Sequence, residues 1–213
     1  MLRKFLNQLL ENPALFNLMR THISGDFTPI RHELVSPQAR RILDIACGTA
    51  FYSRDLYADQ NIFYCGVDSS PVYVSYAVKN FSGGHFIIGD AFSLPIASGS
   101  FERALSLGFL HHIDDRQVSH VLREIHRVLK PGGTLLLAEP ILFFRFLLFL
   151  LIPRRVLVRL DRGQHVRCPS AYNSLFPSGF TLLRDYPFRN GPHDWWAFVL
   201  RKKAEGASPD GAY

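Results

Sequence analysis

From residue 41 onward, short apolar runs alternate with amphipathic stretches, and this alternation limits the folds open to the chain. Runs of this kind predict buried strands, and the stretches between them have helical periodicity. Strands that alternate with helices form right-handed βαβ units around a parallel sheet. We therefore expect a doubly wound α/β fold. The predicted strands are Arg41–Ile45, Ile62–Val67, His85–Ile88, Phe101–Leu107 and Thr134–Ala138.

The two ends of the chain have different patterns. Residues Phe180–Tyr186 and Trp195–Leu200 are strand-like and flank a turn-forming stretch, which predicts an antiparallel hairpin that completes a seven-stranded, mostly parallel sheet. Residues 1–40 are assigned to a helical cap, because Leu2–His22 has helical apolar spacing with a break near Pro13. The main domain then spans 41–203, and the small, polar residues 204–213 are expected to form a disordered tail.

Composition excludes some classes of partner. A length of 213 residues indicates one domain. The net charge of +6 is spread along the chain without a basic block, so we do not expect a nucleic-acid partner. The three cysteines form no CxxC pair, and the N-terminus lacks a signal-peptide pattern, which indicates a cytoplasmic protein with free thiols. No metal is expected, because nothing has zinc-ligand spacing.

The loop Asp44–Ala50 follows the first predicted strand and is the strongest candidate for a ligand site. The small residue Ala46 and the glycine Gly48 allow a ligand to approach the backbone closely. A dinucleotide would place its pyrophosphate on the following helix N-terminus, where the negative charge of Asp44 would repel it. A ligand with a cationic amino group and no phosphate suits Asp44 better. S-adenosylmethionine is such a ligand.

Two more acids come at the ends of the next two predicted strands. Asp68 lies where an acid commonly accepts both ribose hydroxyls of a nucleoside ligand. Asp90, followed by Ala91, is placed to accept a hydrogen bond from an adenine amino group. Each acid alone could be a helix N-cap, but three at successive strand ends are harder to explain in that way.

In order, these motifs resemble those of class I S-adenosylmethionine-dependent methyltransferases, most closely the type 11 small-molecule and lipid group. The family is Rossmann-like, and the resemblance covers residues 40–140 well. One departure is that glycines usually stand where this chain has Ala46 and Ala50, and we expect Ala50 to narrow the pocket. The matching segments are Ile42–Leu56, Val67–Ser70, Gly89–Pro95, Phe101–His112 and Arg127–Gly133.

The resemblance implies a set of cofactor contacts, to which Tyr52 is added because an aromatic ring there could shape the pocket. Leu107 would contact the cofactor from the fourth strand. The other implied contacts are Asp44, Ala46, Gly48 and Thr49 at the methionine end, Asp68 and Ser69 at the ribose, and Asp90 and Ala91 at the adenine.

The sulfonium methyl group is already activated, so transfer is mainly a matter of holding the acceptor in line with it. An acceptor hydroxyl or acidic carbon also needs a general base, for which histidine is well suited. His111 and His112 follow the fourth strand, and Glu139 ends the fifth. The resemblance implies that a histidine and an acid here serve as base and partner. The alternative is that one histidine packs under the loop or caps the next helix.

The segment 141–178 begins with the unusual apolar run Ile141–Val158, which arginines interrupt and flank. A membrane span needs roughly 20 predominantly apolar residues, so this interrupted run does not predict one. Three interpretations stay open: a lid over the acceptor, a homodimer interface, or peripheral membrane contact through 141–162. Because the family builds its acceptor pocket here, we expect a small, apolar acceptor.

Other functions remain to be weighed against a small-molecule methyltransferase. A nucleotide-sugar or NAD-dependent enzyme is disfavoured by Asp44 and by the missing third glycine. A non-catalytic partner subunit with this fold is a further alternative, although all three cofactor acids are present. An RNA methyltransferase would fit the positive charge, but no appended RNA-binding module is visible. Salt-dependent RNA binding would revive that alternative.

Overall fold

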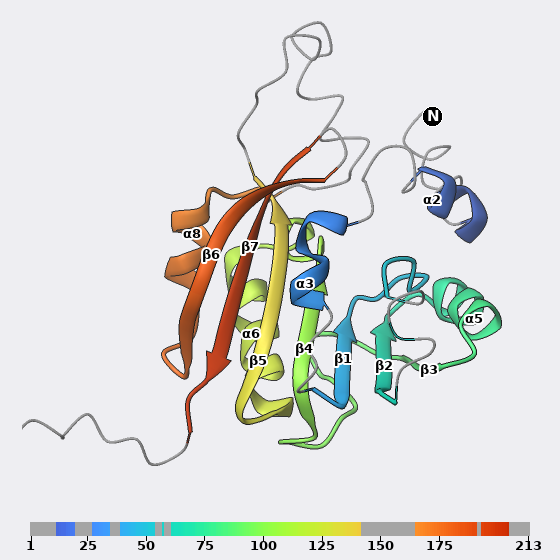
Figure 1. Cartoon of the computed structure of the whole chain (residues 1–213), viewed down its shortest axis with the longest axis horizontal. Helices are drawn as coiled ribbons and strands as arrows, with labels where there is room; N and C mark the ends of the chain where they lie inside the picture. The colour runs from blue at the N-terminus through green and yellow to red at the C-terminus, as the bar shows by residue number, and fades with distance from the viewer. Residues whose placement is uncertain are drawn as a thin grey trace, which may run out of the picture.

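The computed structural model describes residues 12–19, 27–34, 39–53, 57, 61–141, 165–190 and 193–204. These residues form a seven-stranded sheet of order β3-β2-β1-β4-β5-β7-β6 (Figure 1). The neighbouring pairs among β1 to β5 are parallel, whereas β7 runs antiparallel to both β5 and β6. The expectation of a mostly parallel, doubly wound sheet with a C-terminal antiparallel hairpin is confirmed.

Strand boundaries agree with the sequence pattern except at β5 and in the hairpin. The predicted fifth strand started at Thr134, but β5 begins at Leu129, where it pairs with Phe101. A Cβ on Gly133 would lie 2.9 Å from the Lys130 carbonyl oxygen. Glycine avoids this steric clash, so the strand can continue through residue 133. The strands are β1 Arg41–Ile45, β2 Phe63–Asp68, β3 Gly84–Ile88, β4 Phe101–Leu107, β5 Leu129–Pro140, β6 Phe180–Asn190 and β7 His193–Lys202.

Short helices surround the sheet. Asp114 caps the longest of them by accepting from the Gln117 backbone N–H, while the Gln117 side chain accepts from the Asp114 backbone N–H. The described helices are α2 Pro13–Met19, η2 Thr28–Ile30, α3 Arg31–Leu34, α5 Pro71–Asn80, η3 Leu110–His112, α6 Asp115–Val128 and α8 Pro169–Leu175.

Two apolar cores cover the two faces of the sheet, because successive strand residues point to opposite faces. Leu43 and Ile45 of β1 belong to one core, which α6 and α8 complete. Ile42 belongs to the other core, which contains residues of α3 and α5. Figure 1 shows α3 in front of the sheet and α6 behind it.

The N-terminal helix α2 begins at the predicted break. Asn12 accepts hydrogen bonds from the backbone N–H groups of Ala14 and Leu15, which starts the helix at Pro13. Phe16 stacks on Tyr73 of α5, with 4.8 Å between ring centroids. The predicted apolar lid lies largely outside the described residues, as do most of the tail and the start of the cap.

Candidate functional site

The loop after β1 has an unusual backbone. Ala46, Gly48 and Ala50 have φ angles of +56°, +56° and +54°, in the left-handed region that favours glycine. Ala46 lies in the wall of a cavity, whereas Ala50 is only 1% exposed and packs in the core. The expectation that Ala50 narrows the pocket was therefore wrong, and Ala46 is the alanine that faces it.

This cavity has a volume of about 360 Å³, including the space at its mouth. It brings together the expected contacts from the β1 loop with Leu107 from the end of β4. It also includes residues that the sequence analysis did not identify, among them Phe16 of α2. Among the residues that the structure describes, no lysine or arginine lines it. The lining residues are Phe16, Asp44, Ala46, Cys47, Gly48, Thr49, Phe51, Tyr52, Ser53 and Leu107.

Asp44 is the buried acid of this cavity. Its Oδ2 accepts a 2.6 Å bond from the Tyr64 hydroxyl and a 2.7 Å bond from the Ser53 hydroxyl. Burial raises the pKa of Asp44 to about 6, although both hydrogen bonds oppose this rise. The carboxylate thus predominates at neutral pH, and a cationic group beside it would be stabilised.

Asp68 at the end of β2 holds the same loop. Its Oδ2 accepts from the Gly48 backbone N–H and its Oδ1 from that of Ser70, each at 2.8 Å. Burial raises the pKa of Asp68, while these two backbone bonds oppose the rise. Each carboxylate oxygen can accept further bonds, as a ribose diol requires. Ser69 is exposed next to it.

Asp90 lies just beyond β3 and is exposed. Its Oδ1 accepts the backbone N–H of Phe92 at 2.9 Å, which fixes the turn around Ala91. The backbone N–H of Gly89 donates to the Asp68 carbonyl, so the two strand ends are joined. Asp68, Ser69, Asp90 and Ala91 therefore lie along the strand ends next to the cavity rather than in its lining.

Helix α2 packs directly on the β1 loop. The Thr49 hydroxyl donates a 2.5 Å hydrogen bond to Oδ1 of Asn17, and both side chains are buried. A Cβ on Gly48 would lie 3.8 Å from the Phe16 ring. The sequence pattern indicated a helix here, but helical periodicity cannot tell which surface it will cover.

A histidine and a glutamate meet at the ends of β4 and β5. Nδ1 of His111 lies 2.7 Å from Oε2 of Glu139, and both side chains are buried. Glu139 also accepts the backbone N–H groups of Phe109, Leu110 and His111. The side chain of His112 is exposed. Of the two candidate histidines, the structure pairs His111 with Glu139.

The chemistry of these groups fits S-adenosylmethionine. Asp44 offers a negative charge to a cationic amino acid end, and the carboxylates of Asp68 and Asp90 stand in order along the neighbouring strand ends. Small residues in the loop leave its backbone accessible. The same arrangement would place the negative charge of Asp44 near the phosphates of a dinucleotide.

Comparison with known proteins agrees with this geometry. A methyltransferase domain family matches residues 42–133. The O-methyltransferase rstn1 of Aspergillus nomiae is 30% identical over 116 residues, which cover 52% of this chain and 51% of that protein. A demethylmenaquinone methyltransferase of Thermotoga maritima is 37% identical over 107 residues, which cover 49% and 44%. The chain spans about half the length of the curated relatives it matches.

Solved structures show the same fold. An S-adenosylmethionine-dependent methyltransferase from Methanosarcina mazei superposes with a TM-score of 0.69, at 20% identity, over 84% of this chain and 100% of that one. Sequence motifs, strand order, strand-end acids and family match all agree. In its motifs, its matched domain and its strand order, the chain is thus similar to class I S-adenosylmethionine-dependent methyltransferases.

Proposed function

We propose that this protein transfers a methyl group from S-adenosylmethionine to a small, apolar acceptor that carries a hydroxyl or an acidic carbon. The observation that carries the proposal is an aromatic cluster that runs from the cofactor cavity to the His111–Glu139 pair. When bound, S-adenosylmethionine supplies a sulfonium-activated methyl group. The acceptor must then lie in line with it, between the cavity and the histidine.

The aromatic cluster is continuous. Tyr52 lines the cavity and meets Phe27 edge-on, with 4.4 Å between ring centroids. Phe27 in turn meets Trp195 at 5.0 Å. A Cβ on Gly108 would lie 2.9 Å from the Trp195 ring and 3.8 Å from Cε1 of His111, so the cluster ends beside that histidine. Such a wall favours a flat, apolar acceptor.

Two buried N–H donors belong to the same region. The Asn190 Oδ1 accepts the Phe27 backbone N–H at 2.9 Å. The Nδ2 of Asn190 and the Nε1 of Trp195 are buried and have no hydrogen-bond partner among the residues that the structure describes. Unsatisfied buried donors are rare in folded proteins. An oxygen atom on the acceptor would satisfy them, which supports an acceptor with a ring-bound oxygen.

His111 is the base in this proposal. A carboxylate only accepts hydrogen bonds, so Nδ1 of His111 donates to Glu139 and Nε2 retains its lone pair. Nε2 would take the proton from the acceptor as the new bond to the methyl carbon forms and the sulfur–methyl bond breaks. Glu139 would stabilise the resulting imidazolium. His112, which was also a candidate, has an exposed side chain.

Calorimetry followed by a labelled-methyl assay tests the proposal. We expect binding of S-adenosylmethionine and its demethylated product, and transfer of label to 1,4-naphthohydroquinone or to apolar phenols from a cell extract. Asp44→Asn should lose binding, whereas His111→Ala should bind the cofactor but lose turnover. Label found only on small polar metabolites or on RNA would contradict the proposed acceptor class. Full turnover by His111→Ala would eliminate the base role.

Peripheral membrane contact through 141–162 stays a separate proposal. None of the described helices is long and apolar enough to cross a membrane. The support is the sequence itself, in which an apolar run is flanked by arginines. Flotation with anionic liposomes should recover the protein. If no more protein floats with the liposomes than without them, membrane contact is contradicted. Sedimentation equilibrium in the same buffer would detect the alternative, a homodimer.

A further inference from the structure

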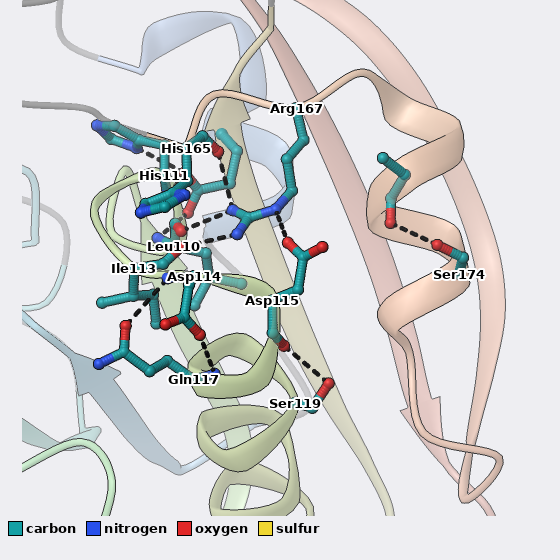
Figure 2. A network of polar contacts seen from close by, with 12 residues as sticks. Leu110, His111, Ile113, Asp114, Asp115, Gln117, Ser119, His165, Arg167 and Ser174 are labelled. Atoms are coloured by element: carbon teal, nitrogen blue, oxygen red, sulfur yellow. Dashed lines mark hydrogen bonds and ion pairs between the residues drawn. The ribbon is translucent and has the colours of Figure 1, made fainter.

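Arg167 lies at the start of the described segment that follows the apolar run, and its guanidinium is almost fully buried. Only 7% of the side chain is exposed. Nη1 donates to the carbonyl oxygens of Leu110 and His165, each at 2.9 Å, and Nη2 donates to that of Ile113 at 2.7 Å. Nε pairs with Oδ1 of Asp115 at 2.8 Å. Figure 2 shows these contacts converging on one group.

The residues that Arg167 binds surround the proposed base. Residues 109–113, which we call the His111 turn, are held from two sides. Glu139 accepts three backbone N–H groups of this turn, at Phe109, Leu110 and His111. On the other side Arg167 donates to two of its carbonyls, and the His165 backbone N–H donates to the His111 carbonyl at 2.9 Å (Figure 2).

A clamp of this kind needs an arginine. The guanidinium is planar and presents five donors in a fixed fork, so it can bind three carbonyls and a carboxylate together. A lysine would offer a flexible point charge that cannot span the same acceptors. The side chain of Asp115 is 73% exposed, so its ion pair with Arg167 contributes little to stability. The hydrogen bonds to the three carbonyls therefore hold the His111 turn in place.

We propose that Arg167 is a positioning residue for His111. It fixes the backbone of the His111 turn, so that Nδ1 stays on Glu139 and Nε2 stays directed toward the acceptor. The catalytic consequence rests on the proposed function, but the effect of Arg167 on the His111 ring does not. Displacement of a catalytic group by about 1 Å can cost on the order of a hundredfold in rate.

The test is the tautomer of His111, measured by long-range ¹H–¹⁵N NMR on the full-length protein without an acceptor. In the wild type we expect the Nδ1–H tautomer. In Arg167→Lys we expect a mixture of tautomers, because the turn is no longer held. An unchanged His111 spectrum in this variant would overturn the proposal. Should Arg167→Lys not fold, Arg167→Gln gives the same test, because its shorter, neutral amide cannot reach all three carbonyls, and an unchanged spectrum is again contrary.

Arg41→Lys is the matched control. Nε of Arg41 donates to the Ser100 carbonyl at 2.9 Å, and its guanidinium lies over the Phe63 ring at 4.3 Å. These contacts are at the opposite end of the sheet. Arg41→Lys should therefore lower thermal stability without moving the His111 signals. If Arg41→Lys shifts the His111 signals as much as Arg167→Lys does, the change reflects a general loss of stability, and the proposal fails.

Turnover of 1,4-naphthohydroquinone separates this inference from the proposed function. If Arg167 acts through His111, Arg167→Lys should lower kcat about tenfold or more with unchanged cofactor affinity. The double variant with His111→Ala should then be no slower than His111→Ala alone. Additive losses would overturn the positioning role. Full activity of His111→Ala would instead refute the base role, while the NMR result would still decide whether Arg167 orients the ring.

Discussion

The phenol of Tyr64 donates a 2.6 Å hydrogen bond to Oδ2 of Asp44, and both side chains are buried beside the cofactor cavity. Burial also raises the pKa of Tyr64, so this phenol keeps its proton and can only stabilise the carboxylate as a donor. Even with this bond and that of Ser53, the pKa of Asp44 is about 6. The protein keeps a costly negative charge where the cofactor's cationic end is expected.

Cofactor affinity should therefore fall in mild acid. A bound cation and a proton compete for Asp44, so protonation below its pKa of about 6 removes the attraction. We expect the Kd for S-adenosylmethionine to rise by up to about tenfold for each pH unit below that value. Calorimetry across this range measures the effect. Affinity that does not change across it would show that Asp44 does not face the cation.

The apo protein should become more stable when the charge is removed. The folded-state pKa of Asp44 is raised above its ordinary value of 3.8, so the native state holds the proton more tightly than the unfolded state. Stability therefore falls as pH rises from about 4 to about 6 and stays reduced above that. Asp44→Asn should raise the free energy of unfolding at neutral pH by about 1–3 kcal/mol, measured by urea denaturation.

The same urea titration has an internal control. Below about pH 4 the wild-type carboxyl is also neutral, so the difference between Asp44→Asn and the wild type should largely disappear. A stability gain that persists in acid would point to packing rather than charge. The variant should lose cofactor binding at every pH.

Gly108 should tolerate alanine poorly. Its φ is +71°, and a Cβ would lie 2.9 Å from the Trp195 ring. Gly99 is the matched control, because its φ is +63° and a Cβ there would meet nothing within 4 Å. Both substitutions should cost roughly 1 kcal/mol for the left-handed backbone. Gly108→Ala should cost about 1–3 kcal/mol more, from overpacking. Equal losses in denaturant titrations would show that Trp195 can move aside.

The Asn17–Thr49 bond should control how firmly α2 lies on the cofactor loop. Thr49→Val keeps the shape but leaves the Asn17 carbonyl oxygen without its donor, which costs about 1–3 kcal/mol. We expect faster amide exchange across 13–19 and weaker cofactor binding. The double variant with Asn17→Ala should be less impaired than the sum of the two single variants. Unchanged exchange in α2 would contradict this role.

Much of the fold could be predicted because local sequence determines it. The bounds of β1 and β4 match the apolar runs, and the turn-forming residues 189–193 indicated the hairpin. The errors arose where tertiary contacts outweigh local signals. The predicted fifth strand begins at Thr134, yet pairing of Phe101 in β4 with Leu129 starts β5 five residues earlier. Of the two neighbouring acids at the start of α6, Asp114 caps the helix and Asp115 pairs with Arg167, a distinction that local sequence does not make.

The candidate site could be predicted only in part, for a related reason. The acids Asp44, Asp68 and Asp90 lie at or just beyond the carboxyl ends of successive strands, so chain order alone places them along one edge. Phe16 and Arg167 lie outside the segment 40–140 that carries the motifs, and no local pattern indicates which loop they contact. Such contacts depend on how distant segments pack, and the sequence pattern carries no signal for them.

The strand order has a consequence for synthesis. β7, at residues 193–202, lies between β5 and β6 and carries Trp195 into the aromatic cluster. A ribosome that has made only the residues before 193 has produced both neighbours of β7 but not the strand that joins them. The nascent sheet then exposes the unpaired edge of β5, a template for aggregation. The edge of β5 therefore stays unpaired until β7 has left the ribosome.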